Sequence, residues 1–231
     1  MPQTPEIFLD AKGIFKSFRR DGQEIPILNG IDLALPCGTV TVIRGRSGTG
    51  KSTLLSLLAG LDRPTSGSIN LNGNFLERLD NESLALLRKQ TLGFVFQSFN
   101  LLPSWTAREN VEAVLMHSGL PPERRREKVV ALMTKLDLSE RLEHLPHQLS
   151  VGQQQRVAVA RTLVNEPQLI LADEPTGDVD SETAAEMLNL LIGSVREKGA
   201  TLLVATHGSF PLKLADRLYS LENGKLVENP S

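Results

Sequence analysis

The amino-acid sequence predicts an α/β fold: a core with a mostly parallel sheet, an antiparallel β flank and an inserted α-helical lobe. Continuous apolar runs separated by long helical patterns are typical of strands buried inside a parallel sheet. Shorter apolar segments with turn signals between them crowd the first third of the chain and are typical of antiparallel strands. From residue 99 to residue 165 the pattern becomes helical and charged, which indicates the helical lobe.

The first strand-like segments are short and are bounded by turn residues. They cover residues 7–18, 27–35, 39–43 and 68–71. Asn72-Gly73 follows the last of them and is a strong turn signal. We expect all four segments to contribute to the antiparallel flank.

The later elements alternate between buried strands and helices. Continuous apolar strands are expected at residues 92–96, 169–172 and 201–205. Helices are expected at residues 108–117, 122–136 and 153–164.

A hairpin is expected between strands 217–221 and 225–228, because Asn223 and Gly224 both tolerate positive φ. The chain is therefore expected to form a single domain over residues 1–231. Within it we assign the core with its antiparallel flank to residues 1–97 and 166–231, and the helical lobe to residues 98–165.

The composition limits the classes of protein to which the chain can belong. Its 231 residues are 40% hydrophobic and 23% charged, and 25 basic against 27 acidic residues give a net charge of −2. This balance, with a pI near 6.1, argues against a nucleic-acid-binding surface. No apolar stretch approaches the roughly 20 residues of a membrane span, and the first residues lack a secretory signal pattern. We therefore expect a cytoplasmic chain without a membrane span, and its single cysteine excludes an internal disulfide bond.

A Gly-rich loop lies where the apolar strand 39–43 gives way to a helical pattern. It consists of Gly45, Arg46, Ser47, Gly48, Thr49, Gly50, Lys51 and Ser52. The glycines let the backbone turn tightly and aim N–H groups inward, and the following helix adds its positive end. This is the pattern of a phosphate-binding loop. In this interpretation Lys51 neutralises the β- and γ-phosphate oxygens, Ser52 is a ligand of the accompanying Mg²⁺, and Thr53 reaches the α-phosphate.

Two adjacent carboxylates, Asp173 and Glu174, end the apolar strand 169–172. An open α/β sheet places its ligand-binding groups at this end of its strands. Asp173 is therefore predicted to hold the Mg²⁺ shell, and Glu174 to polarise an attacking water beyond the γ-phosphate. The pair alone could equally cap a following helix, but the phosphate-binding loop favours a nucleotide site.

Ser150 and Gln153 have the spacing of a capping box before a helical run. The pattern predicts the start of a helix, where backbone N–H groups have no partner within the helix. Taken alone, such a segment is usually structural.

These segments, in this order, resemble the nucleotide-binding domain of an ATP-binding cassette (ABC) transporter, and the resemblance covers essentially the whole chain. The stretches 92–97, 100–103, 109–111 and 172–177 are similar to those of LolD-like and MacB-like ATPases of lipoprotein release and macrolide export. The resemblance implies a P-loop NTPase fold with ATP and Mg²⁺ as cofactors. It also implies a homodimer in the ATP-bound state, in which Ser150, Gly152 and Gln153 of one subunit contact the ATP held by the phosphate loop of the other.

Further residues match positions of that family. Phe18 matches the aromatic residue that stacks on adenine, and Gln97 matches the glutamine that touches Mg²⁺ and the water. His207 matches the histidine that contacts the γ-phosphate, and Asp180 lies in the loop that crosses the dimer interface. The residues that the resemblance implies for catalysis are Lys51, Gln97, Glu174 and His207. Those that it implies for the metal are Ser52, Gln97 and Asp173.

Four departures from the family pattern stand out. Val151 replaces a glycine, Gly208 replaces an aspartate, Asp178-Val179 replaces Asn-Leu, and Arg44 occupies a normally apolar strand end. None of them removes a catalytic group, so we expect hydrolysis to survive. The Cβ of Val151 is expected to affect closure of the dimer.

The resemblance implies an ATPase subunit that drives movement in separate transmembrane permease subunits at the inner face of the cell membrane, in an export or lipoprotein-release system. Trp105 and residues 101–108 are expected either to line the groove for those subunits or, for Trp105, to pack in the lobe. One alternative is an ATP-dependent signalling module on a membrane partner without transport. A soluble ABC ATPase acting on DNA or ribosomes is disfavoured, because the chain has no long coiled coil and no second cassette.

Overall fold

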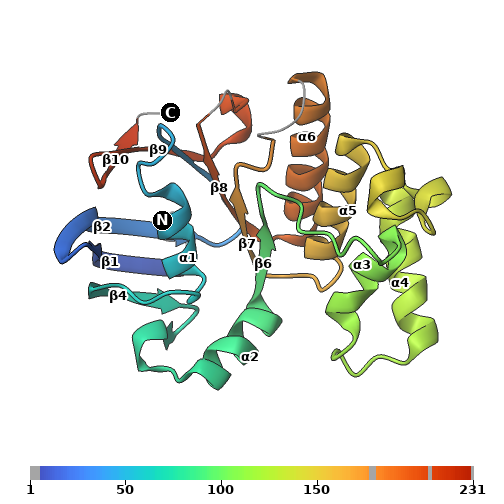
Figure 1. Cartoon of the computed structure of the whole chain (residues 1–231), viewed down its shortest axis with the longest axis horizontal. Coiled ribbons are helices and arrows are strands. Elements are labelled where there is room, and N and C mark those ends of the chain that lie inside the picture. Colours follow the sequence, from blue (N-terminus) through green and yellow to red (C-terminus); the bar gives the residue numbers. More distant parts are fainter. Residues whose placement is uncertain (1–5, 177–180, 208–209, 230–231) are drawn as a thin grey trace, which may run out of the picture.

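The structure is a computed structural model that describes residues 6–176, 181–207 and 210–229. Two sheets and a set of helices make up the fold (Figure 1). The strands are β1 (Ile7–Arg20), β2 (Gln23–Pro36), β3 (Val40–Arg44), β4 (Ser66–Leu71), β5 (Asn74–Phe75), β6 (Leu92–Val95), β7 (Leu169–Asp173), β8 (Thr201–Thr206), β9 (Arg217–Glu222) and β10 (Lys225–Asn229). The α-helices are α1 (Lys51–Leu58), α2 (Asn81–Thr91), α3 (Ala107–Glu112), α4 (Pro122–Lys135), α5 (Val151–Leu163) and α6 (Ser181–Lys198).

The larger sheet has the strand order β10-β9-β3-β8-β7-β6. Every pairing in it is parallel except that of β9 with β10, which confirms the predicted mostly parallel core. The prediction that residues 39–43 belong to the antiparallel flank is wrong, because β3 lies inside this sheet between β8 and β9. All residues of β3 except the last are buried, as is typical of a strand covered on both faces.

The smaller sheet has the order β2-β1-β4-β5 and is antiparallel throughout. This confirms the flank for residues 7–18, 27–35 and 68–71. Strands β1 and β2 run further than predicted, until Arg20 pairs with Gln23 across a turn in which Asp21 and Gly22 have φ of 52° and 78°. The extra residues on both sides of this turn are exposed, and the four next to it, Arg19, Arg20, Gln23 and Glu24, are polar, so the apolar pattern could not show how far the hairpin continues.

Helices α3, α4 and α5 pack together on the side of β6 away from the smaller sheet (Figure 1). The helices predicted at residues 122–136 and 153–164 are confirmed with small shifts at their ends. The predicted helix at 108–117 is shorter, because α3 gives way to a 3-10 turn at Ala113–Leu115. The hairpin of β9 and β10 is also confirmed, with φ of 51° at Asn223 and 73° at Gly224.

Alternate residues of the parallel strands face two separate hydrophobic cores. On β7, Ile170 and Ala172 belong to the core shared with α3 to α6, whereas Leu169 and Leu171 belong to the core shared with α1 and the smaller sheet. All four side chains are fully buried. Because neither face of the strand meets solvent, charged groups are accommodated at the strand ends. In the part of the chain that is described, no helix is both long and apolar enough to cross a bilayer.

Gly67 in β4 is a position where a side chain should disturb the smaller sheet. Its φ is +99°, and a Cβ atom there would lie 2.3 Å from the carbonyl oxygen of Gly13. We expect Gly67→Ala to lower the free energy of unfolding by about 2–3 kcal/mol, because the strained backbone must shift. The control is Gly193→Ala in α6, where a Cβ atom meets nothing within 4 Å. Alanine there should raise the free energy of unfolding by about 0.5–1 kcal/mol. Urea unfolding measures the stability of both variants, and equal stabilities would contradict this account of Gly67.

Candidate functional site

The carboxyl ends of β3, β7 and β8 lie side by side. Strand β8 pairs in parallel register with β3 on one side and with β7 on the other, up to the last residues of both neighbours. The Gly-rich loop follows β3, Glu174 follows β7, and His207 follows β8. The fold therefore brings these three parts of the sequence to one edge of the sheet, where open α/β sheets bind their ligands.

The loop between β3 and α1 depends on its glycines. Gly48 and Gly50 have φ of +80° and +102°, which residues with a side chain rarely adopt. A Cβ atom on Gly45 would lie 2.7 Å from Oγ1 of Thr49 and 2.8 Å from the carbonyl oxygen of Leu221. No side chain caps the start of α1, so its first N–H groups are available to an anion.

The ammonium group of Lys51 lies inside this loop. The residue is only 6% exposed, and its Nζ donates to the carbonyl oxygens of Gly45 at 2.8 Å and Arg46 at 3.2 Å. The same nitrogen lies 3.2 Å from Oε1 of Glu174. The cation therefore joins the loop after β3 to the carboxylate after β7.

Glu174 is held in an uncommon backbone conformation. Its φ is +47°, a value that is sparsely populated for residues with a Cβ atom. Its N–H donates to the carbonyl oxygen of Ala205 at 2.8 Å. Its Oε2 accepts from the backbone N–H of His207 at 3.0 Å and lies 2.7 Å from Nδ1 of the same residue. One carboxylate oxygen thus faces Lys51 and the other faces His207, in a side chain that is almost fully buried.

Asp173 has the properties of a metal-binding carboxylate. Its Oδ1 is buried and has no hydrogen-bond partner among the described residues. Burial raises the pKa of Asp173, the hydroxyl of Ser52 lowers it by hydrogen bonding, the charge of Glu174 raises it, and Lys51 lowers it. A buried acceptor beside a hydroxyl is a pair of hard oxygen ligands, which suits Mg²⁺ with its remaining waters. The residues present therefore fit a magnesium ion.

Two of the predicted residues lie apart from this group. Phe18 is 45% exposed, and the ammonium of Lys16 lies 4.9 Å from the centre of its ring. Gln97 is exposed just after β6. In the described ranges, no hydrogen bond or ion pair links either residue to the loop or to the two carboxylates.

A cavity of about 430 Å³ lies between the loop and the β9–β10 hairpin. Gly45, Arg46 and Thr49 line it on the loop side, and residues 220–223 line it on the hairpin side. Arg44 also borders the cavity and donates from Nη2 to the carbonyl oxygen of Phe210 at 3.1 Å. The arginine at this strand end is thus accommodated by a backbone acceptor.

Ser150 and Gln153 form the predicted capping box at the start of α5. The hydroxyl of Ser150 accepts from the N–H of Gln153 at 3.3 Å, and Oε1 of Gln153 accepts from the N–H of Ser150 at 3.0 Å. Gly152 lies in the first helical turn, and Val151 beside it is 47% exposed. This helix start therefore faces outward. The predicted interface residue Asp180 and the departures Asp178, Val179 and Gly208 lie outside the described residues.

Two residues that no sequence motif marks hold the segment after Gln97. Arg161 of α5 donates to the carbonyl oxygens of residues 99 and 100. Asn110 of α3 is buried, and its amide accepts from the N–H of Leu102 at 2.7 Å and donates to its carbonyl oxygen at 3.2 Å. A polar residue within a helical pattern gives no sign of a distant backbone partner, so only the structure identifies these contacts.

Comparisons with known proteins agree with this fold and site. The sequence profile of the ABC transporter family matches residues 28–177. The chain is 45% identical over 226 residues to the macrolide export ATP-binding/permease protein MacB of Marinobacter nauticus, across 98% of this chain and 35% of that protein. It is 43% identical over 209 residues to the pyoverdine export ATP-binding/permease protein PvdT of Pseudomonas entomophila, across 90% and 32%. The chain spans about a third of the length of these curated relatives.

The fold is also that of a solved cassette. A dimeric post-hydrolysis state of the ATP-binding cassette MJ0796 bound to ADP and Pi matches with a TM-score of 0.89 and 36% identity, across 96% of this chain and 97% of that one. This match confirms the predicted P-loop NTPase fold, and the family profile covers more than half of the chain. The chain therefore belongs to the ABC transporter family and has the fold of an ATP-binding cassette.

Proposed function

We propose that the chain binds ATP with Mg²⁺, hydrolyses it to ADP and phosphate, and forms a homodimer around two nucleotides that drives movement in separate permease subunits. The observation that carries the proposal is the contact of the buried Lys51 with the buried Glu174, which also contacts the exposed His207, beside Asp173 and at the end of the phosphate loop. The relatives above are named as export ATP-binding/permease proteins, so export at the inner face of the cell membrane is the process that we assign.

The phosphate loop is the proposed binding site for the triphosphate. The backbone N–H groups of residues 45–50 and of the start of α1 receive the phosphate oxygens, and Lys51 turns from its two carbonyl partners toward the β- and γ-phosphates. Thr53 reaches the α-phosphate, and Phe18 stacks on adenine. Ser52, Asp173 and Gln97 would hold the magnesium ion, which would neutralise the charge that develops on the phosphate oxygens.

Glu174 is the proposed general base. When Lys51 moves onto the phosphates, Oε1 of Glu174 loses its cation and becomes free to accept a proton from the attacking water. His207 retains Oε2 through its backbone N–H, which orients the carboxylate, while its exposed ring contacts the γ-phosphate. The ion pair between Lys51 and Glu174 thereby ties the release of the base to the arrival of the nucleotide.

The outward-facing start of α5 is the proposed contact with the second subunit. Ser150, Gly152 and Gln153 approach the ATP of the partner at the positive end of the dipole of that helix. The exposed side chain of Val151 enters the same interface. Asp180 completes the interface from the loop after the carboxylates.

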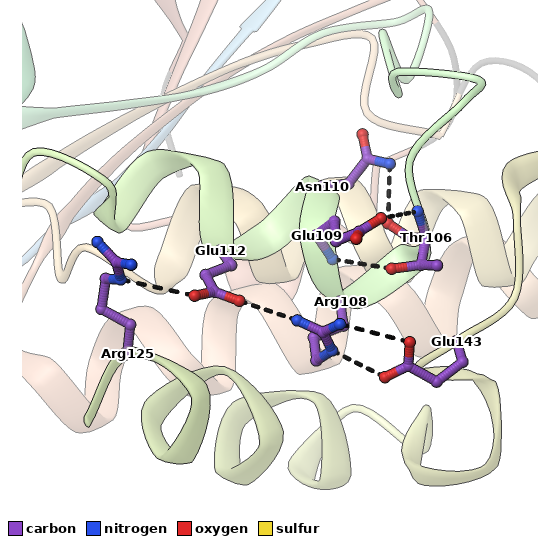
Figure 2. A network of polar contacts seen from close by, with 7 residues as sticks. All are labelled: Thr106, Arg108, Glu109, Asn110, Glu112, Arg125 and Glu143. Carbon is purple, nitrogen blue, oxygen red and sulfur yellow. Dashed lines mark hydrogen bonds and ion pairs between the residues drawn. The ribbon is translucent and has the colours of Figure 1, made fainter. Parts of the chain in front are cut away.

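The helical lobe at residues 98–165 is the proposed part that contacts the permease, with residues 1–97 and 166–231 as the catalytic core of the single domain. Ion pairs cross-link the lobe (Figure 2): Arg108 lies 2.9 Å from Glu112 and 2.8 Å from Glu143, and Glu112 also faces Arg125 at 3.5 Å. The hydrogen bond from Arg108 holds the pKa of Glu143 below its usual range. These charges join α3 to α4 and to the segment before α5.

Removing the proposed base should separate ATP binding from hydrolysis. We expect Glu174→Gln to bind ATP but to lose about 10²-fold or more in turnover, because the water loses its proton acceptor. ATPase assays of the purified chain measure this, with Glu197→Gln, an exposed carboxylate on α6, as the control. Light scattering in ATP–Mg²⁺ should find the Glu174 variant as a dimer. Hydrolysis at the rate of the parent chain would sink the assignment.

Removing the lysine should weaken nucleotide binding itself. We expect Lys51→Ala to lose roughly 10- to 100-fold in ATP affinity, which is the effect of losing a hydrogen-bonded charge from a phosphate site. Isothermal titration calorimetry measures the affinity, and circular dichroism checks folding, because the substitution leaves Glu174 buried without its cation. The exposed Lys135 provides the control substitution. Unchanged affinity in a folded variant would reject the phosphate-loop interpretation.

Removing the buried carboxylate should raise stability while it removes metal dependence. The pKa of Asp173 is higher in the folded chain than in the unfolded chain. The ionised carboxylate therefore lowers the free energy of unfolding at a pH above the pKa of the folded chain. This loss disappears at a pH below the pKa of the unfolded chain. We expect Asp173→Asn to raise the free energy of unfolding by on the order of 1 kcal/mol at pH 7 and to lose this advantage in acid. The same variant should bind ATP equally with and without Mg²⁺. Thermal melts over a pH series and calorimetry test both claims, and a retained Mg²⁺ effect would contradict the metal assignment.

A further inference from the structure

Arg161 connects helix α5 to the segment that follows Gln97. Its Nη2 donates to the carbonyl oxygen of Phe99 at 2.6 Å, and its Nη1 donates to that of Asn100 at 2.7 Å. Two short bonds from one planar guanidinium fix the orientation of two consecutive peptide groups. The backbone turns sharply at this point, because Asn100 has a φ of +50°.

The surroundings of Arg161 indicate that an arginine is needed at this position for these two hydrogen bonds and not for an ion pair. Within the described ranges no carboxylate forms an ion pair with it, and burial lowers its pKa. An apolar side chain would occupy the same space without the cost of burying a cation. The guanidinium therefore serves the geometry of the segment rather than charge balance.

Other contacts show where the segment is fixed and where it is not. Thr162, next to Arg161, donates to the carbonyl oxygen of Phe94 in β6 at 2.9 Å. Beyond Asn100, the amide of Asn110 binds both backbone groups of Leu102. Between these anchors, residues 96–98 have no hydrogen-bond partner in the described part of the chain. Gln97 is in the middle of this short stretch.

We propose that Arg161 is a positioning residue that holds residues 99–102 on α5, so that Gln97 lies between two backbone segments, Phe94 and residues 99–102, that are anchored on the same helix. The inference rests on the proposed function, in which Gln97 meets one nucleotide and the Ser150 end of α5 meets the other. Through Arg161, the position of Gln97 at the first ATP becomes linked to the approach of α5 to the second. Without Arg161, Gln97 and helix α5 reach their two nucleotides independently. The dimer then closes less often with both in position.

The kinetic test compares three variants. Arg161→Met keeps the apolar stem and removes both bonds, and Arg161→Lys keeps the charge but replaces the planar fork by a single ammonium. Arg156→Met is the control, because Arg156 lies on the same helix and bonds to Asp137 and Glu186 instead. We expect Arg161→Met to lose about 10-fold or more in kcat with ATP affinity changed less than about twofold, and Arg161→Lys to recover part of the loss. Arg156→Met should retain kcat within about threefold.

A second readout does not depend on hydrolysis. In a Cys37→Ser background, nitroxide labels at Ser98 and at Thr134, an exposed position on α4, report the distance between the segment and the lobe. We expect a narrow distance distribution in the parent chain and in Arg156→Met, a broad one in Arg161→Met, and an intermediate one in Arg161→Lys. If the parent chain does not hydrolyse ATP, the proposed function fails, yet these distances still decide the role of Arg161.

Unchanged distances in a folded Arg161→Met would overturn the proposal. So would a loss of kcat that Arg156→Met shares equally, because the effect would then come from general loosening of α5. If Arg161→Met does not fold, Arg161→Lys carries both measurements. A lysine variant identical to the parent chain in both would also overturn it, since the two-bond geometry would then be unnecessary.

Discussion

The site of this cassette depends on one constraint: the central strands are covered by a hydrophobic core on each face. A strand such as β7, fully buried through residues 169–172, accommodates ionised groups at its ends and not along its length. The carboxyl ends of β3, β8 and β7 are in register, so the loop after one strand meets the acids and the histidine that follow the others. The proposed catalytic arrangement is thus a consequence of how the sheet is buried.

Within that arrangement, the contact between Lys51 and Glu174 has two effects. A buried ion pair contributes little net stability, because desolvation offsets most of the attraction. Its value here is geometric: it holds the ammonium of Lys51, which is proposed to bind phosphate, 3.2 Å from the carboxylate of Glu174, the proposed base. The positive φ of Glu174 and its bond to the backbone of His207 keep the carboxylate in this place from the other side.

Local patterns in the sequence predicted the parts of the structure that local physics decides. The Gly-rich loop, the capping box of Ser150 and Gln153, and the turn at Asn223-Gly224 each need particular residue types at fixed spacing, and each lies where it was expected. The sheet to which β3 belongs was predicted wrongly, because its neighbours β8 and β9 come from distant parts of the chain. The orientation of Glu174 and the partners of Arg161 likewise could not be predicted from the sequence. Both depend on backbone groups that only the folded chain brings close.

The position of β3 between β8 and β9 also limits the order in which the chain can fold. During synthesis β3 leaves the ribosome long before either neighbour exists, so its hydrogen-bonding groups stay solvated until residues 201–222 have been made. Long-range parallel pairing of this kind folds slowly and leaves apolar strands exposed in the meantime. The phosphate loop, which begins at the end of β3, therefore has its neighbouring strands in place only after residues 201–222 have been added.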